Sequence, residues 1–264
     1  MGTVVFCNGV PASADDLTRL AFDNYGSFTS MQVRDRAVVG LSLHLARLTS
    51  QAHELFGTAP SDAALLEELV AAVPAEGAFS VRVTLVSPDL SKTLAGGSLV
   101  PDVVVSVAEP REPAETPLRL CSVTYARETP HLKHRATFGL LRAQRLARMQ
   151  GGDDALFVDS TGRISEGSTW NLCVHDGEGW VWPEAPSLLG VTQQVLSRAM
   201  EEAGLAFTTR VLAVPDLERC SAFATNAVSP MRPIAVIDET PLTMDPQAAR
   251  QLADLWQAAP RESF

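Results

Sequence analysis

The sequence predicts an α+β protein, in which strands and helices are mixed without strict alternation. Short β-branched and aromatic runs are typical of strands, and longer segments carry apolar residues at helical spacing. Gly and Pro are frequent but scattered, so they separate short elements and do not mark a disordered tail. Because a doubly wound parallel sheet requires strands and helices in regular alternation, this order argues against that architecture.

The first half is expected to contain five strands and two helices. The strands are expected at residues 3–7, 28–33, 37–39, 79–86 and 99–107, with a hairpin turn at Asn8-Gly9. A helix is expected over residues 42–56. Its apolar residues lie on one helical face, namely Leu41, Leu45, Leu48, Ala52 and Leu55. Ser61-Asp62 is expected to begin a second helix that ends near Val73.

The second half is expected to contain further strands and two helices. The strands are expected at residues 118–125, 154–158, 171–174, 180–182, 205–214 and, as a pair around a loop, within 222–237. One helix should follow Lys133 and present a single apolar face of Phe138, Leu141, Leu146 and Met149. The other should begin at Gly190, end at Gly204 and bury Val195, Leu196, Ala199 and Ala203.

A proline-rich, charged stretch at residues 108–117 (AEPREPAETP) is the best candidate for a linker. We therefore expect an N-terminal α/β domain over residues 1–112, a linker over 113–117 and a C-terminal domain over 118–264.

Composition and charge exclude several classes of function. The formal net charge is −10, and no basic stretch is interleaved with aromatic residues, so a nucleic-acid partner is not expected. No apolar run is long enough to span a membrane, and the first residues do not resemble a signal peptide, so we expect a cytoplasmic protein. The four cysteines are far apart and lie in apolar runs, which favours buried free thiols over a disulfide framework. No metal site is expected.

Four segments carry residues suited to cofactor chemistry. Lys133 lies between a strand and a helix, and a lysine in a partly desolvated site can attack a carbonyl group. Glu166 in GRISEGSTWN offers a carboxylate that can keep a pyridine nitrogen protonated. LLGVTQ at residues 188–193 opens a helix whose free N–H groups suit a phosphate. Arg47 in HLARL can bind phosphate oxygens.

Each of these segments also has an ordinary interpretation. An isolated lysine is usually a solvated surface charge, and a carboxylate at a strand end usually faces water. A Gly-x-Thr at a helix start is common capping, and an arginine beside an apolar stripe can extend to solvent.

Taken together, the segments resemble the class IV aminotransferases, the fold-type-IV pyridoxal-phosphate enzymes, which include branched-chain and D-amino acid aminotransferases and aminodeoxychorismate lyase. The stretches that match, in the family's order, are YGSFTSMQV (25–33), HLARL (44–48), HLKHRATFGLL (131–141), DDALFVDSTGRISEGSTWNL (153–172), LLGVTQQVL (188–196) and FATNAVSPMRPI (223–234). The run around Glu166 is the most specific of them.

The resemblance implies roles for particular residues. Lys133 would be the catalytic residue and would hold pyridoxal 5'-phosphate as a Schiff base, with Glu166 at the pyridine nitrogen. The phosphate would be held by Arg47, Gly190, Val191 and Thr192, with Thr225 and Asn226 close by. The candidate substrate contacts are Tyr25, Thr29, Gln32 and Arg232. The family fold implies a smaller α/β sandwich domain and a larger pseudo-barrel domain, usually in a homodimer.

The expected activity is amino transfer between an amino acid or amine and a 2-keto acid. Three features leave alternatives open. Residues 15–26 (DDLTRLAFDNYG) lack the family's usual pattern, and Phe138 stands near the place of a tyrosine found in branched-chain members. The loop TNAVSPMRP looks more like that of the lyase. The alternatives are therefore a lyase that releases pyruvate, and a pyridoxal-phosphate-binding homologue that has lost catalysis.

Overall fold

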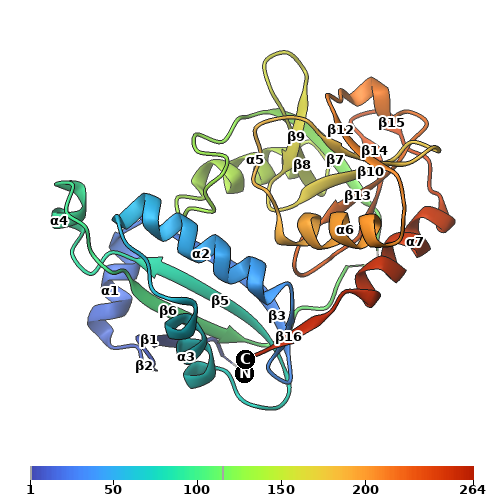
Figure 1. Ribbon diagram of the computed structural model, residues 1–264. Helices are drawn as coiled ribbons and strands as arrows, with labels where there is room; N and C mark the ends of the chain where they lie inside the picture. Colours follow the sequence, from blue (N-terminus) through green and yellow to red (C-terminus); the bar gives the residue numbers. More distant parts are fainter. Residues whose placement is uncertain (1, 115) are drawn as a thin grey trace. The chain divides into compact units, whose positions relative to one another are not determined.

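A computed structural model describes residues 2–114 and 116–264 of the chain (Figure 1). Residue 1, in the expected first domain, and residue 115, in the expected linker, lie outside the described residues. The chain forms two compact units. Unit 1 comprises Met1–Arg111, Leu132–Ala136 and Pro260–Phe264, and unit 2 comprises Glu112–His131 and Thr137–Ala259. The segment around Lys133 therefore belongs to the unit formed mainly by residues up to Arg111.

Unit 1 contains a seven-stranded antiparallel sheet in the order β16-β4-β3-β5-β6-β1-β2. The strands are β1 (Val4–Cys7), β2 (Val10–Pro11), β3 (Gly26–Arg34), β4 (Ala37–Val39), β5 (Ala78–Val86), β6 (Asp102–Ala108) and β16 (Arg261–Ser263). Asn8, which takes a positive φ, and Gly9 form the expected turn between β1 and β2. The longest pairing joins β3 to β5 over their whole length.

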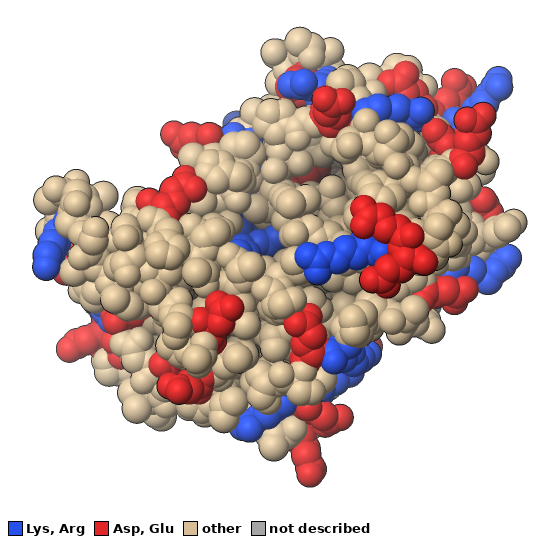
Figure 2. Space-filling view, viewed as in Figure 1, with Lys and Arg blue, Asp and Glu red and all other residues tan. Residues whose placement is uncertain are grey.

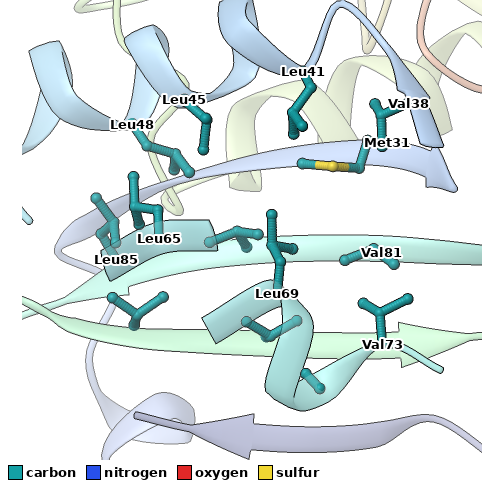
Figure 3. Close-up of a cluster of buried hydrophobic side chains, with 14 of the residues drawn as sticks. Met31, Val38, Leu41, Leu45, Leu48, Leu65, Leu69, Val73, Val81 and Leu85 are labelled. Carbon is teal, nitrogen blue, oxygen red and sulfur yellow. The ribbon is translucent and has the colours of Figure 1, made fainter. Parts of the chain in front are cut away.

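Two helices cover one face of this sheet, α2 (Leu41–Phe56) and α3 (Asp62–Ala72). Figure 3 shows their leucines pointing at the strands, where Leu48, Leu65 and Leu85 are at most 1% exposed. Both helices agree with the sequence expectation. The Ser61 hydroxyl accepts a hydrogen bond from the Ala64 N–H, as a helix cap should.

Two short helices of unit 1 do not appear in the sequence expectation. They are α1 (Ala14–Phe22) and α4 (Leu90–Leu94). No residue of α1 is fully buried, although Leu20 packs against a small apolar cluster of Cys7, Val86 and Val104. A capping box between Ser13 and Asp16 begins this helix.

Unit 2 contains a nine-stranded mixed sheet in the order β12-β11-β10-β13-β14-β7-β8-β9, with β15 paired to β14. The strands are β7 (Leu118–Thr124), β8 (Asp154–Val158), β9 (Ile164–Gly167), β10 (Asn171–His175), β11 (Trp180–Pro183), β12 (Phe207–Arg210), β13 (Ser221–Thr225), β14 (Arg232–Ile237) and β15 (Thr240–Pro241). The terminal strand β9 also contacts β10 and β11, so the sheet curls back on itself around an apolar core.

Three helices and a 3-10 turn complete unit 2: α5 (Phe138–Met149), α6 (Val191–Glu202), α7 (Pro246–Ala258) and η1 (Val214–Leu217). Buried side chains of α6 and α7 pack with Trp180, Trp182 and Phe223 of the sheet. The mixed α+β fold with a curled sheet agrees with the predicted fold class.

The face of α5 that packs against the sheet differs from the predicted one. Leu140, Ala143 and Ala147 are buried against β7 and β8. The expected apolar face is largely open, since Phe138 is 77% exposed, and Leu141 and Met149 also face solvent. Helical periodicity predicts which residues share a face, but it does not predict which face is buried. The small side chains of Ala143 and Ala147 allow α5 to approach the strands closely, and this packing decides the buried face.

Other expectations for the second half need smaller corrections. The strand expected over 205–214 is shorter, because β12 runs only from Phe207 to Arg210. Ala203, expected on the buried face of α6, is the exposed C-cap residue of that helix. The sequence expectation also lacks β9, β15, α7 and β16. The short strands carry too few residues to show a period of two.

The surface carries both signs of charge. On the face shown in Figure 2, Lys and Arg side chains are scattered among Asp and Glu on a largely uncharged surface. No helix among the described residues is both long and apolar enough to cross a bilayer.

Candidate active site

The Lys133 segment lies alongside β3 in unit 1. The Phe28 N–H donates to the Lys133 carbonyl over 2.9 Å, and the Arg135 N–H donates to the Gly26 carbonyl over 2.9 Å. Gly26 has φ of +144°, and a side chain there would collide with the Leu85 carbonyl. Lys133 itself lies outside any helix or strand. Its backbone is held by β3, every residue of which is paired with β5.

The side chain of Lys133 lies near Phe28 and a buried histidine. Its Nζ is 5.0 Å from the centre of the Phe28 ring. The imidazole of His44, from α2, is buried, and the Thr29 Oγ1 lies 2.6 Å from its Nδ1. Burial, with the charges of Arg47 and Lys133, lowers the pKa of His44 to about 3. His44 is therefore a neutral imidazole near two cations.

Further arginines lie near Phe28 in unit 1. The Arg82 guanidinium lies 4.3 Å from the centre of the Phe28 ring, so two cations contact the same phenyl group. Burial lowers the pKa of Arg82, and the charges of Arg111 and Arg135 lower it further. Arg135 donates from Nη2 to the Leu20 carbonyl, while its buried Nη1 has no hydrogen-bond partner within the described residues. This cluster is suited to binding an anion.

Glu166 of β9 is buried in unit 2. Its Oε1 accepts a hydrogen bond from the Leu188 N–H over 3.3 Å, and Arg127 Nε lies 3.7 Å from the same oxygen. Both side chains are about 5% exposed. The hairpin after Glu166 is packed closely, since a side chain at Gly167 would collide with the Trp170 indole, whose Nε1 donates to Asp154.

The sequence GVT at residues 190–192 begins α6 as predicted. Gly190 is the N-cap and makes no side-chain hydrogen bond, so no cap of its own competes for the N–H groups of the first turn. Val191 and Thr192 are buried. Thr225 is also buried, and its Oγ1 donates to the Asn171 carbonyl over 3.1 Å. Such an uncapped helix start suits an anion.

Asn226 lies in the loop after β13 and organises that loop. Its Oδ1 accepts from the N–H groups of Val228 and Ser229, and its Nδ2 approaches the Thr169 carbonyl at 3.4 Å.

The candidate substrate residues are distributed over both units. In unit 1, Tyr25 donates from its hydroxyl to the Leu55 carbonyl and Thr29 contacts His44. Gln32 exchanges hydrogen bonds with Ser80 and accepts one from the Arg111 N–H. In unit 2, Arg232 donates to the Thr116 carbonyl over 2.8 Å. The hydroxyl and amide groups of the three residues in unit 1 thus have partners within the protein.

Several polar residues near these groups are not among the sequence candidates, namely Arg82, Arg127, Arg135 and Asn171. Arg135 lies two residues from Lys133, while Arg82, Arg127 and Asn171 lie in runs typical of an ordinary strand or loop, and the folded chain brings them beside Phe28, Glu166 and Leu188. Within the described residues, no group of His, Cys, Asp and Glu is arranged to hold a metal ion.

Comparison with solved structures identifies the fold. A hypothetical aminotransferase from Mycobacterium tuberculosis in a PLP-bound form is 22% identical, with a TM-score of 0.78 and 98% of both chains covered. A branched-chain aminotransferase from Thermoproteus uzoniensis with norvaline is 19% identical, with a TM-score of 0.81 and 97% and 94% covered. The fold IV-transaminase CpuTA1 from Curtobacterium pusillum is 21% identical, with a TM-score of 0.79 and 98% and 100% covered. At these identities the likeness establishes the fold.

The family follows from the sequence itself. A family model described as amino-transferase class IV matches residues 26–237, which is more than half of the chain. The chain therefore belongs to the class IV aminotransferase family, a family of enzymes. A comparison with curated proteins gave no match.

Proposed function

We propose that this protein is a pyridoxal 5'-phosphate-dependent aminotransferase that moves an amino group between an amino acid or amine and a 2-keto acid. The observation that carries the proposal is Lys133, whose backbone is fixed along β3 while its Nζ lies near the neutral His44 and Phe28. Family membership supplies the reaction class, and the PLP-bound form of the similar Mycobacterium tuberculosis protein supports the cofactor.

The residues present fit the chemical parts of this cofactor. Glu166 is a buried carboxylate, which suits a pyridine nitrogen that must stay protonated. The first turn of α6 offers N–H groups without a side-chain cap, which suit phosphate oxygens. Arg47 follows His44 by three residues on α2 and would supply a cation to the same phosphate. Thr225 and Asn226 would lie close to it.

When bound, the cofactor supplies a protonated ring that withdraws electrons from the substrate's α-carbon. Lys133 is proposed to bind the cofactor covalently through Nζ. Once released by the incoming amine, the same Nζ would take up the proton from the α-carbon. His44 stays uncharged, so it adds no positive charge near the Lys133 Nζ.

An acidic substrate group is consistent with the cations of unit 1. Arg82, Arg111 and Arg135 lie close enough to affect one another electrostatically, and a carboxylate would relieve their mutual repulsion. We propose that amino acids and 2-keto acids bind through this group, with Tyr25, Thr29 and Gln32 on neighbouring positions and Arg232 as a further candidate contact. A homodimer and a cytoplasmic location are part of the same proposal, by resemblance to the family.

The test is a reaction screen with protein loaded with pyridoxal phosphate. Amino donors are mixed one at a time with a 2-keto acid, and the keto acid product is measured by mass spectrometry, with Lys133→Ala as the control. A product that requires both donor and acceptor supports the proposal.

Two results would contradict it. Pyruvate released from aminodeoxychorismate at enzymatic rates without an added keto acid would identify a lyase. Tight cofactor binding with no product from any donor, including no single-turnover reaction, would identify a homologue without catalysis.

A further inference from the structure

Both backbone polar groups of Leu188 are held by side chains from neighbouring strands. The N–H of Leu188 donates to Glu166 Oε1 over 3.3 Å, and its carbonyl accepts from Asn171 Nδ2 over 2.7 Å. Glu166 and Asn171 are 3% and 8% exposed, so water competes little with either hydrogen bond. The loop between β11 and α6 is thus held at Leu188 by one hydrogen bond from its N–H and one to its carbonyl group.

Asn171 also lies against Gly190, the N-cap residue of α6. A Cβ added at Gly190 would collide with Asn171 Oδ1. The φ of Gly190 is −64°, which any residue can adopt, so glycine is needed here for space and not for conformation. Asn171 itself is held by Thr225, which is its register partner in the β10–β13 ladder and hydrogen bonds its carbonyl.

We propose that Asn171 is a positioning residue for phosphate binding at the start of α6. This inference rests on the proposed function, in which the N–H groups of Val191 and Thr192 bind the phosphate. Gly190 has no side-chain cap to orient the first turn. The orientation of the first turn is therefore set by contacts from outside the helix. These contacts are the hydrogen bond from Asn171 to Leu188 and the packing of Asn171 against Gly190.

The same arrangement links two ends of the proposed cofactor site. Glu166, assigned to the pyridine nitrogen, and Asn171, assigned here to the phosphate end, hold the same residue, Leu188. Loss of the Asn171 side chain would leave the bond from the Leu188 N–H to Glu166 in place, so the N–H groups of α6 would shift more than the Glu166 carboxylate. Hydrogen-bonded groups that bind a ligand through geometry lose affinity when they move by fractions of an ångström.

The test separates phosphate binding from overall stability. Apo protein is titrated with pyridoxal phosphate and with pyridoxal, which lacks the phosphate, and the ratio of the two dissociation constants is measured. Asn171→Ala should weaken pyridoxal phosphate about tenfold, the equivalent of one lost or misaligned hydrogen bond, and leave pyridoxal within about twofold. Inorganic phosphate should raise the melting temperature of the wild type but not of this variant.

The matched control is Ser221→Ala. Ser221 lies in the same sheet and also donates a side-chain hydrogen bond to a backbone carbonyl, that of Thr243. Its loss should lower stability and leave the affinity ratio unchanged. Asn171→Asp keeps the side-chain volume but removes the donor to Leu188, and it carries the same expectation should Asn171→Ala fail to fold.

The outcomes are distinct. An unchanged ratio in a folded Asn171 variant would overturn the inference and leave the residue a purely structural role. A wild-type protein that binds neither compound would overturn the proposed function instead.

Discussion

Thr29 and His44 form a buried pair in which the threonine Oγ1 lies 2.6 Å from the histidine Nδ1. Thr29 is fully buried, so this contact fixes the orientation of the imidazole, whose pKa is lowered by burial and by the charges of Arg47 and Lys133. A neutral histidine in such a place has a measurable consequence for stability.

Stability of the apo protein should fall with acidification in a way that depends on His44. The folded pKa is about 3, and the ordinary value is 6.5. Below pH 6.5 the unfolded chain binds a proton that the folded chain does not, so acid favours unfolding by on the order of 1 kcal/mol per pH unit. The contribution of the neutral His44 to the free energy of unfolding is fully present above pH 6.5 and is lost as the pH falls towards 3.

The measurement is urea denaturation of wild type and His44→Asn at pH 7, 6 and 5. Asparagine can still bond Thr29 but does not titrate. The stability difference between the two proteins should narrow towards pH 5, and a constant difference would show that His44 does not titrate as described.

Replacement of Lys133 by alanine should abolish covalent attachment of the cofactor. Borohydride reduction of the wild type with pyridoxal phosphate should label one peptide, and mass spectrometry should locate the label at Lys133. Lys92, on the short helix α4 and outside the proposed site, provides the control variant Lys92→Ala, which should label normally. A label on another lysine would contradict the assignment.

Glu166→Gln should slow proton removal from the substrate more than it weakens cofactor binding. The amide keeps an oxygen for the Leu188 N–H but cannot hold a pyridine nitrogen in its protonated state. Exchange of the α-proton in deuterated water should slow by at least about tenfold, while the dissociation constant for the cofactor changes less. Equal exchange rates in the two proteins would remove the proposed role.

Arg127 and Glu166 should be coupled energetically. Both side chains are about 5% exposed, and removal of one partner from a buried ion pair typically costs ~3–5 kcal/mol. Arg127→Leu should therefore destabilise strongly, and combination with Glu166→Gln should recover part of the loss. Chemical denaturation of the four proteins of this cycle gives the coupling energy. Strictly additive losses would mean that the pair does not interact.

Glu262 should stabilise α2 although it lies 220 residues from Ser42 in the first turn of that helix. Its carboxylate accepts from the N–H of Ser42 over 3.0 Å, near the positive end of the helix dipole. Glu262→Ala should cost about 1 kcal/mol in thermal or chemical unfolding, the usual cost of a lost helix cap. The exposed Glu239, changed to alanine, is the control and should have little effect. Similar losses in both variants would argue against a capping role.

The amino-acid sequence alone determined the elements whose patterns are local. Strand runs such as residues 79–86, the amphipathic helix over 42–56 and the Ser61 cap could be predicted because propensity and periodicity act over a few residues. The mixed order of the predicted strands and helices led to the α+β fold class, and the six ordered motifs led to the family; the fold and the family match confirm both.

Tertiary structure decided everything that depends on long-range pairing. The Leu132–Ala136 segment joins β3 of unit 1, far from its neighbours in sequence, and Glu262 caps a helix from the end of the chain. The buried face of α5 depends on close packing of alanines against strands. Asn171 looks like any strand residue until the fold brings it to Leu188, because a hydrogen bond across a loop leaves no periodic signal in the sequence.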